Sequence, residues 1–188
     1  MLGPVLECAE IDGEPLRLVP TQQRHLAACV RWLNDPVVTR FLAVSFGLND
    51  SGEEKWYAEI SADPAKVVWS IELGDLHVGQ TAIENIRPRE RTGVTGLLIG
   101  EPSCWGKGIA TAVMRRRAAY AFRELNLVAL YTEIFTTNEA SLRAAARAGY
   151  REWGRRPFAK YQDGEYLTSW LGVLSREEWE RAAVAPSR

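Results

Sequence analysis

The sequence has little of what marks several common protein classes. Its 188 residues include only three cysteines and two histidines, and the formal net charge is −1. Cys8, Cys29 and Cys104 lie far apart and form no CxxC pair, so we expect reduced thiols, no disulfide framework and no metal site. A chain with so little net charge is not a general polyanion binder, and we expect no nucleic-acid partner.

Long apolar runs are also missing. No segment approaches about 18 uncharged apolar residues, so we expect no membrane-spanning helix. The first residues, "MLGPVLECAEIDGEPLRL", lack the basic start and the apolar stretch of a signal peptide. With 46% hydrophobic and 25% charged residues, the composition is that of an ordinary globular protein. We therefore expect one cytoplasmic domain over residues 1–188.

The first third of the chain reads as a strand followed by two helices. Leu16–Val19 is the first expected strand. The apolar residues of "TQQRHLAACVRWLNDP" recur at helical spacing until the sequence Asn-Asp-Pro at 34–36 stops them. A second helix is expected from "SGEEKWYAEI", where Ser51 and Glu54 have the spacing of a capping box.

The hydrophobic period then changes to that of strands. Residues 67–73, 77–86 and 92–100 are expected to form an antiparallel meander with short turns. An apolar helix follows Gly108, and the apolar strand 127–135 follows that helix. Strand, helix and strand in this order form a crossover between parallel strands.

The last third adds a helix, a hairpin and a final helix. Asn138 is the expected N-cap of the first of these helices, and Gly149 the glycine that ends it. Asp-Gly at 163–164 is a strong hairpin signal, and Ser175 with Glu178 forms a second capping box. The pattern predicts an α/β fold with a mixed, mostly antiparallel sheet and helices on both faces.

The stretch "IGEPSCWGKGIATAVMRRRAAYAF", residues 99–122, places a glycine turn directly before a helix. It lacks the GxxxxGK[ST] spacing of a nucleotide-triphosphate loop, and Thr111 stands where a dinucleotide fingerprint needs its third glycine. The first amides of the helix, from Gly106 to Thr111, could still converge on a diphosphate, which suggests a carrier cofactor. The alternative is that the glycines only make a tight turn.

The segment "CWGKGIATAVM" resembles the acyl-CoA diphosphate loop of the GNAT acetyltransferase superfamily. Gly108 and Ala110 match the last two fixed positions of that loop, and Trp105 occupies its Arg/Gln position, as in the RimJ/RimL-like branch. The resemblance continues in order through "RWLNDPVVTRFL", "TTNEASLRAAARAGY" and "DGEYLTSWLGVLSREEW". It implies a single GNAT-like domain with a V-shaped splay between its fourth and fifth strands, residues 92–100 and 127–135.

The same resemblance implies acetyl-CoA (coenzyme A) as the cofactor and no metal. The pantetheine arm would pair with the fourth strand, the diphosphate would sit on the glycine turn, and Asn138 would hold the arm. A plain helix cap at Asn138 and a solvated helix face at Arg143 remain open. The implied cofactor residues are Leu98, Ile99, Gly106, Lys107, Gly108, Ile109, Ala110, Thr111, Asn138 and Arg143.

The implied reaction is attack of a neutral primary amine on the thioester, with a backbone N–H of the fourth strand stabilising the oxyanion. The amine must first lose a proton. Val94, Ala145 and Lys160 stand where related enzymes place proton-handling groups, so the sequence departs from the family here. The remaining catalytic candidates are Glu84, Ser141 and Tyr166, with Asp35 as a fourth that also suits a turn.

We expect the acceptor to be a primary amine of a small molecule, such as an aminoglycoside-type antibiotic or a polyamine. Aromatic and acidic residues mix between positions 32 and 60, which suits a cationic amine, although the aromatics could instead form the core of two helices. Alternatives are acetylation of a protein N-terminus and a non-catalytic acyl-CoA-binding domain. A monomer and a homodimer are both open. The mixed residues are Trp32, Phe41, Phe46, Trp56 and Tyr57 with Asp35, Asp50, Glu53 and Glu54.

Overall fold

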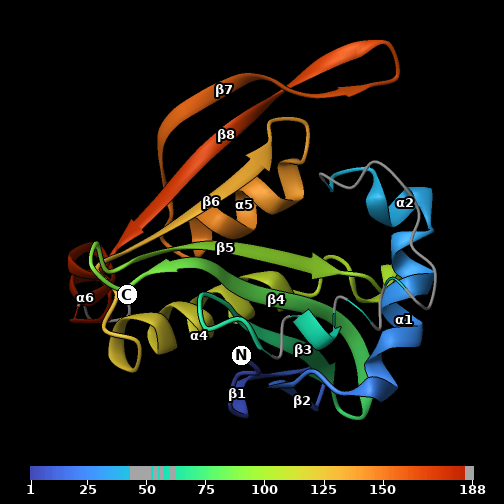
Figure 1. The fold of residues 1–188 in the computed structure, drawn as a ribbon, viewed down its shortest axis with the longest axis horizontal. Helices are drawn as coiled ribbons and strands as arrows, with labels where there is room; N and C mark the ends of the chain where they lie inside the picture. Colours follow the sequence, from blue (N-terminus) through green and yellow to red (C-terminus); the bar gives the residue numbers. More distant parts are fainter. Residues whose placement is uncertain (43–51, 53–54, 56, 60–61, 185–188) are drawn as a thin grey trace.

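The computed structural model describes residues 1–42, 52, 55, 57–59 and 62–184, and its framework is one eight-stranded sheet (Figure 1). The strands are β1 (Leu6–Ile11), β2 (Glu14–Pro20), β3 (Val67–Leu73), β4 (Leu76–Arg87), β5 (Thr92–Ile99), β6 (Ala129–Phe135), β7 (Arg151–Gln162) and β8 (Glu165–Ser175). The helices are α1 (Gln23–Leu33), α2 (Pro36–Thr39), α4 (Ile109–Arg123), α5 (Glu139–Arg147) and α6 (Arg176–Val184), with a 3-10 turn, η1, at Pro102–Cys104.

The strand order is β1-β2-β3-β4-β5-β6-β8-β7, and every neighbouring pair is antiparallel except β5 and β6. β3, β4 and β5 form the predicted antiparallel meander. α4 then carries the chain to β6, which lies parallel to β5 as a strand-helix-strand crossover requires. The mixed, mostly antiparallel sheet predicted from the sequence is therefore confirmed.

The sheet begins earlier than the sequence prediction, which started it at Leu16. β1 precedes β2 in a hairpin whose turn residues Asp12 and Gly13 have φ values of 53° and 82°. Only Leu6 of β1 is buried, and the rest of the strand is half-buried or exposed. A strand on the sheet edge with one buried residue has no apolar alternation, so periodicity does not reveal it.

Helices cover both faces of the sheet. α4 buries Val113, Met114 and Ala118 in the main core, whereas α1 belongs to a second, smaller cluster that includes Trp32. Leu97 packs against the main core and the next residue, Leu98, against the second cluster. Successive strand residues point to opposite faces, so α1 and α4 lie on opposite sides of β5.

The C-terminal hairpin, β7 and β8, extends away from the rest of the sheet at the top of Figure 1. Its turn is the predicted Asp163-Gly164 pair, with φ values of 52° and 87°. The second predicted capping box is also present: the Ser175 amide donates to Glu178 Oε2 at 3.1 Å, and the Glu178 amide donates to Ser175 Oγ at 3.2 Å.

The helix predicted from residue 51 is only partly described. Gly52, Lys55 and residues 57–59 are helical. Its capping residues Ser51 and Glu54 lie outside the described residues. The same holds for five predicted acceptor-site residues, which are Phe46, Asp50, Glu53, Glu54 and Trp56.

Candidate functional site

The two parallel strands of the sheet separate soon after they meet. Their register begins at Thr92 opposite Ala129 and ends at Val94 opposite Tyr131. Residues 95–99 of β5 continue without a register partner on β6. The predicted splay between the fourth and fifth expected strands is thus present between β5 and β6, and it leaves an open strand edge that another extended chain could pair with.

One hydrogen bond fixes which backbone groups face this splay. The Thr132 hydroxyl of β6 donates to the Thr95 carbonyl oxygen at 3.2 Å, so the backbone of Thr95 faces β6. Backbone groups alternate sides along a strand, which turns those of Leu97 and Ile99 to the splay and those of Leu98 to β4. The groups available for the predicted pantetheine contact are therefore those of Leu97 and Ile99 rather than Leu98 and Ile99.

Trp105 forms a hydrogen bond to the last residue of β5. Its indole N–H donates to the Ile99 carbonyl oxygen at 2.8 Å, while its side chain stays exposed. Since this carbonyl already has a donor, Ile99 presents mainly its N–H to the splay. The Leu98 carbonyl oxygen lies against Gly79 of β4, where a Cβ would come within 2.1 Å of it, which agrees with the orientation of Leu98 toward β4.

The glycine turn after η1 leaves the N-terminus of α4 open. Gly106 and Gly108 have φ values of 79° and 83°, and a Cβ on either would meet nothing within 4 Å. The amide of Ala112 makes the bond to the Gly108 carbonyl at 3.1 Å, so the amides of residues 109–111 have no carbonyl inside the helix. The cap has no side-chain hydrogen bond and the first turn carries no acid. These features fit a diphosphate.

Lys107 lies between the two glycines and is paired. Its Nζ lies 3.0 Å from Oδ2 of Asp12 in the β1–β2 turn. The hydrogen bond to this carboxylate and its charge raise the pKa of Lys107. The lysine therefore remains a cation beside the turn, with one of its three donors engaged.

Asn138 caps α5 as the sequence predicts. Its Oδ1 accepts the Ser141 amide at 3.2 Å, which uses the carbonyl end of the side chain. The amide NH₂ group is a separate donor, so the cap and a cofactor contact are compatible. Arg143 pairs with Glu139 at 2.9 Å on the exposed face of α5, which is the arrangement expected of a solvated helix face.

Glu84 lies on β4 directly opposite Val94 of β5, the last β5 residue that pairs with β6. Its side chain is 43% exposed and pairs with Lys66 at 3.4 Å. A carboxylate thus lies on the strand next to the valine, on the same face of the sheet. Asp35 has a structural task, because its side chain accepts the Val37 amide at 2.8 Å and caps α2.

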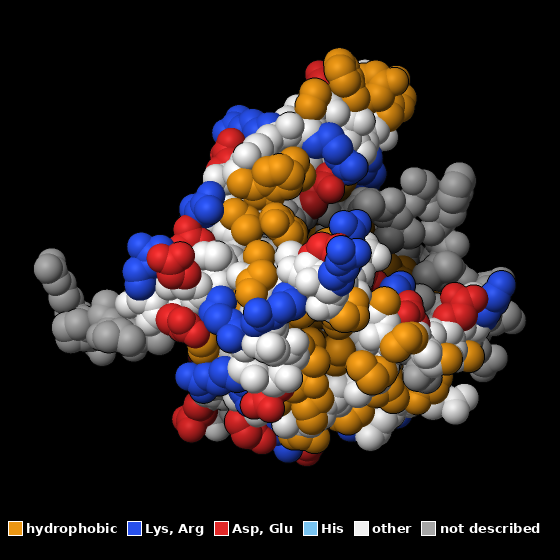
Figure 2. Space-filling view, turned by 60° about the vertical axis from the view of Figure 1, so that its left-hand side comes forward, with side chains coloured by type: hydrophobic (Ala, Val, Ile, Leu, Met, Phe, Trp, Pro, Cys, Tyr) orange, Lys and Arg blue, Asp and Glu red, His pale blue; other side chains and the backbone are white. Residues whose placement is uncertain are grey.

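Tyr166 belongs to an aromatic group on the C-terminal hairpin. Its ring centroid lies 5.3 Å from that of Phe158 and 5.0 Å from that of Tyr161, and all three side chains are exposed. Figure 2 shows hydrophobic side chains gathered at the end of this hairpin. The contacts of Tyr166 therefore lie within the hairpin. Lys160 donates to the Leu42 carbonyl oxygen at 2.8 Å, which ties the same hairpin to the segment after α2.

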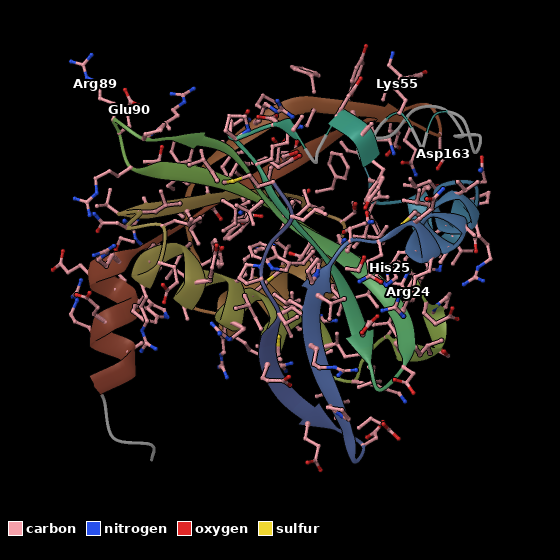
Figure 3. The ribbon with its side chains drawn as sticks, turned by 60° about the horizontal axis from the view of Figure 1, so that its bottom comes forward. Arg24, His25, Lys55, Arg89, Glu90 and Asp163 are labelled. Atoms are coloured by element: carbon pink, nitrogen blue, oxygen red, sulfur yellow. The ribbon has the colours of Figure 1, made fainter. Side chains whose placement is uncertain are left out.

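A pocket of about 650 Å³ opens beside the point where β5 and β6 part. Two carboxylates, Glu90 and Glu133, and two aromatic rings, Tyr131 and Trp153, contribute to its wall. Glu133 also makes an ion pair with Arg156. Figure 3 shows Glu90 at the turn between β4 and β5. The other lining residues are Asn85, Arg87, Thr92, Gly93, Val94, Thr132 and Leu171.

This pocket combines acids with aromatics as the acceptor prediction requires, but it uses other residues. Trp32 from the predicted set is 2% exposed and packs with Cys29 and Val38, so the core alternative is confirmed for it. Phe41 is half-buried, and Tyr57 is half-buried on the partly described helix.

Arg117 and Tyr150 are buried residues whose polar atoms contact β5, and the sequence prediction did not include them. The side chain of Arg117 is 1% exposed, and its guanidinium donates to the Gly96 carbonyl oxygen at 2.6 Å. The Tyr150 hydroxyl lies 3.2 Å from Thr95 Oγ1, also in the interior. A signal for the arginine exists: it follows Met114 by three residues and so falls on the buried stripe of its helix.

The two histidines lie together, His25 buried and His77 half-buried. Their ring centroids lie 4.5 Å apart, and His25 Nε2 lies 3.2 Å from the Glu72 carboxylate. Burial lowers the pKa of His77 to about 4. Burial also lowers the pKa of His25, and this effect outweighs the opposite effect of the hydrogen bond that His25 donates to Glu72. Arg24 pairs with Glu72 at 2.6 Å, and Figure 3 shows Arg24 and His25 together on α1.

The described part of the chain shows neither a metal-binding cluster nor a membrane-spanning helix. None of its side chains form a group of three or more His, Cys, Asp or Glu placed to hold a metal ion. None of its helices is both long enough and apolar enough to cross a membrane.

Comparisons of the sequence with known proteins match acetyltransferases. The family described as Acetyltransferase (GNAT) domain matches residues 15–151. The human protein named Alpha/beta-tubulin-N-acetyltransferase 9 is 28% identical over 131 residues, which is 70% of this chain and 54% of that protein, so the chain spans about half its length. Uncharacterized N-acetyltransferase YoaA of Bacillus subtilis (strain 168) is 27% identical over 125 residues, 65% of this chain and 70% of that protein.

Two solved structures share the fold. Mycobacterium smegmatis RimJ in complex with CoA-disulfide has a TM-score of 0.83 at 20% identity, with 95% of this chain and 93% of that chain covered. Spermidine N-acetyltransferase from Vibrio cholerae, in complex with CoA and spermine, has a TM-score of 0.82 at 19% identity, with 88% and 98% covered.

Proposed function

Because the chain belongs to the GNAT acetyltransferase family, we propose that it transfers the acetyl group of acetyl-CoA to a primary amine of a small molecule. One observation carries the proposal. An open strand edge on β5 leads into a glycine turn and an uncapped helix N-terminus, so a strand-pairing site and an anion site follow each other along one path. Pantetheine and diphosphate are joined in the same order in coenzyme A.

The residues present fit this group. The amides of residues 109–111 and the glycine turn would bind the diphosphate, and the backbone of Leu97 and Ile99 would pair with the pantetheine. The NH₂ group of Asn138 would donate to a carbonyl of the pantetheine while Oδ1 keeps its capping bond. Acetyl-CoA itself would supply the acetyl group as a thioester. Arg143, which already has Glu139 as a partner, would contribute at most charge near the adenosine.

The amine must be deprotonated before it reacts, and we propose that Glu84 accepts this proton through water. Its position opposite Val94 supports the assignment, since the valine replaces the acid usual in related enzymes. Lys66 Nζ forms an ion pair with Glu84 Oε1 at 3.4 Å, which would orient the carboxylate. Ser141 is the proposed source of a proton for the leaving sulfur, and Tyr166 is the weaker choice because its contacts are with hairpin aromatics.

The pocket at the splay supports a cationic acceptor. Glu90 and Glu133 would attract an ammonium group, and the faces of Tyr131 and Trp153 suit the same charge. A polyamine or an aminoglycoside-type antibiotic has this chemistry, and the similar Vibrio cholerae structure holds spermine. Acetylation of a protein N-terminus is the second candidate, favoured by the similarity to RimJ. The human relative is likewise named for a protein acceptor, tubulin.

A thiol-release assay would test the proposal. The purified protein would be mixed with acetyl-CoA and, in separate reactions, polyamines, aminoglycosides or ribosomal N-terminal peptides, with an acceptor-free reaction as the control. We expect release with at least one small amine. Release with peptides alone would support the second candidate, and binding of acetyl-CoA without release on any acceptor would support a non-catalytic domain.

A further inference from the structure

Arg117 of α4 is a charged side chain in the interior of the protein. It is 1% exposed, and its Nε has no hydrogen-bond partner among the described residues. No ion pair joins it to a carboxylate anywhere in the described chain. The guanidinium group is a cation, so a positive charge that has no counter-ion among the described residues lies beneath the sheet.

The guanidinium makes its hydrogen bonds at one point of the sheet. One terminal nitrogen donates to the Gly96 carbonyl oxygen at 2.6 Å and to the hydroxyl of Thr81. The Thr81 hydroxyl in turn donates to the same carbonyl oxygen at 2.8 Å. Gly96 pairs with Ala82 of β4, on the side of β5 away from the splay. Several donors therefore converge on a single carbonyl.

That carbonyl belongs to the same peptide group as the N–H of Leu97. The Leu97 N–H points to the other side of the strand, into the splay, two residues beyond Thr95. Hydrogen bonds to the oxygen of a peptide group withdraw electron density from its nitrogen and make its N–H a stronger donor. A charged donor strengthens this effect.

We propose that Arg117 is a positioning residue that orients and polarises the Leu97 amide as the donor to the thioester oxygen. The inference rests on the proposed acetyl transfer. In that reaction the amine nitrogen bonds to the carbonyl carbon, the C–S bond breaks, the amine gives up a proton and the sulfur gains one. Negative charge develops on oxygen and then on sulfur, and a fixed cation beneath the strand stabilises both without reorganising.

Stability alone does not account for this residue. A buried cation that has no counter-ion among the described residues loses its hydration without a charge to offset the cost, so an apolar side chain of similar length need not destabilise the fold. Arg117→Met keeps a long, flexible side chain in the same space and removes the charge. Arg115→Met is the matched control, because Arg115 lies two residues earlier on α4, is exposed and donates to the Arg147 carbonyl oxygen instead.

The first measurement needs no cofactor. In the ligand-free protein, the Leu97 amide ¹⁵N resonance should move upfield in Arg117→Met, because the hydrogen bonds to its peptide oxygen are weakened, and it should stay in place in Arg115→Met. Arg117→Lys should lie between the two because it keeps a charge but loses the planar fork. An unmoved Leu97 resonance in a folded Arg117→Met protein would overturn the proposal.

The second measurement is kinetic. Arg117→Met should lower kcat about 10- to 100-fold with little change in KM for acetyl-CoA, less than the 10²- to 10³-fold typical when an oxyanion donor is removed outright. Its melting temperature should equal or exceed that of the unmodified protein. Full kcat in Arg117→Met, or a loss explained by unfolding alone, would count against a positioning role. Inactivity of the unmodified protein on every acceptor would instead refute the proposed function, while the ¹⁵N result would stand by itself.

Discussion

Replacing Gly108 with alanine separates the strain of the glycine turn from its role in binding. Gly108 has φ +83°, where a residue with a Cβ costs about 1–2 kcal/mol. A Cβ there meets nothing within 4 Å, so no further clash adds to this cost. In a domain of this size each kcal/mol changes the melting temperature by roughly 2–4 °C. We therefore expect the ligand-free Gly108→Ala protein to melt about 2–8 °C lower and to keep its fold.

Binding should suffer more than stability. An acetyl-CoA concentration about 100 times the dissociation constant stabilises a protein by about 2.7 kcal/mol, which corresponds here to a shift of roughly 5–11 °C. The added Cβ occupies the space through which a phosphate would reach the amides of residues 109–111. Gly108→Ala should lose most of this shift, and the branched side chain of Gly108→Val should remove it.

Gly164→Ala provides the control, because Gly164 has φ +87°, also meets nothing within 4 Å, and lies in the turn between β7 and β8. It should show the same loss of melting temperature without ligand and the full shift with acetyl-CoA. The assay is a thermal melt of the three proteins with and without millimolar acetyl-CoA. A full ligand shift in Gly108→Ala would mean that the diphosphate binds elsewhere.

Substitutions at three other positions give further tests. Asn138→Ala should raise KM for acetyl-CoA and lower stability, whereas Asn138→Asp should keep the cap and raise KM alone. If both variants lose stability and neither changes KM, Asn138 acts only as a helix cap. Glu84→Gln should lower kcat about 10²-fold and leave cofactor binding unchanged, and an unaltered pH-rate profile would make Glu84 structural. Burial holds the pKa of His77 near 4, below its usual 6.5. As the pH falls, the unfolded chain therefore binds a proton at His77 before the folded protein does. The free energy of unfolding should therefore fall by about 3 kcal/mol as the pH drops from about 6.5 to about 4, and denaturant unfolding of His77→Phe should show a flatter fall.

Local signals made most of the fold predictable. The meander, the crossover through α4 and the Asp163-Gly164 turn each depend on residues close together in the sequence, and the structure has all three. β1 was not predicted, because an edge strand with a single buried residue carries no alternation. The acceptor pocket was not predicted either: its carboxylates, Glu90 and Glu133, come from the β4–β5 turn and from β6, and only the folded sheet brings them together.

The direction of backbone groups is a second kind of information that the sequence does not hold. A strand of period two can face either way, and its register decides which amides are free. On β5 the direction is shown by the hydrogen bond from the Thr132 hydroxyl to the Thr95 carbonyl oxygen, which joins residues 37 apart in the sequence. The resemblance to acetyltransferases predicts a cofactor contact on this strand, and the orientation of its backbone makes Leu97 and Ile99, rather than Leu98 and Ile99, the residues whose groups face the splay.

Arg117 shows how a buried charge can be noticed without a structure. Three arginines follow Met114 in a row, and such a run usually reads as a solvated helix face. Helical spacing separates them: Arg115 and Arg116 lie off the apolar stripe, whereas Arg117 lies three residues after Met114 and one before Ala118, within it. A charge on an apolar stripe must either reach water or find polar partners inside. For Arg117 those partners are the Gly96 carbonyl oxygen of β5 and the Thr81 hydroxyl of β4, so the charge lies beneath the strand that is proposed to bind the thioester.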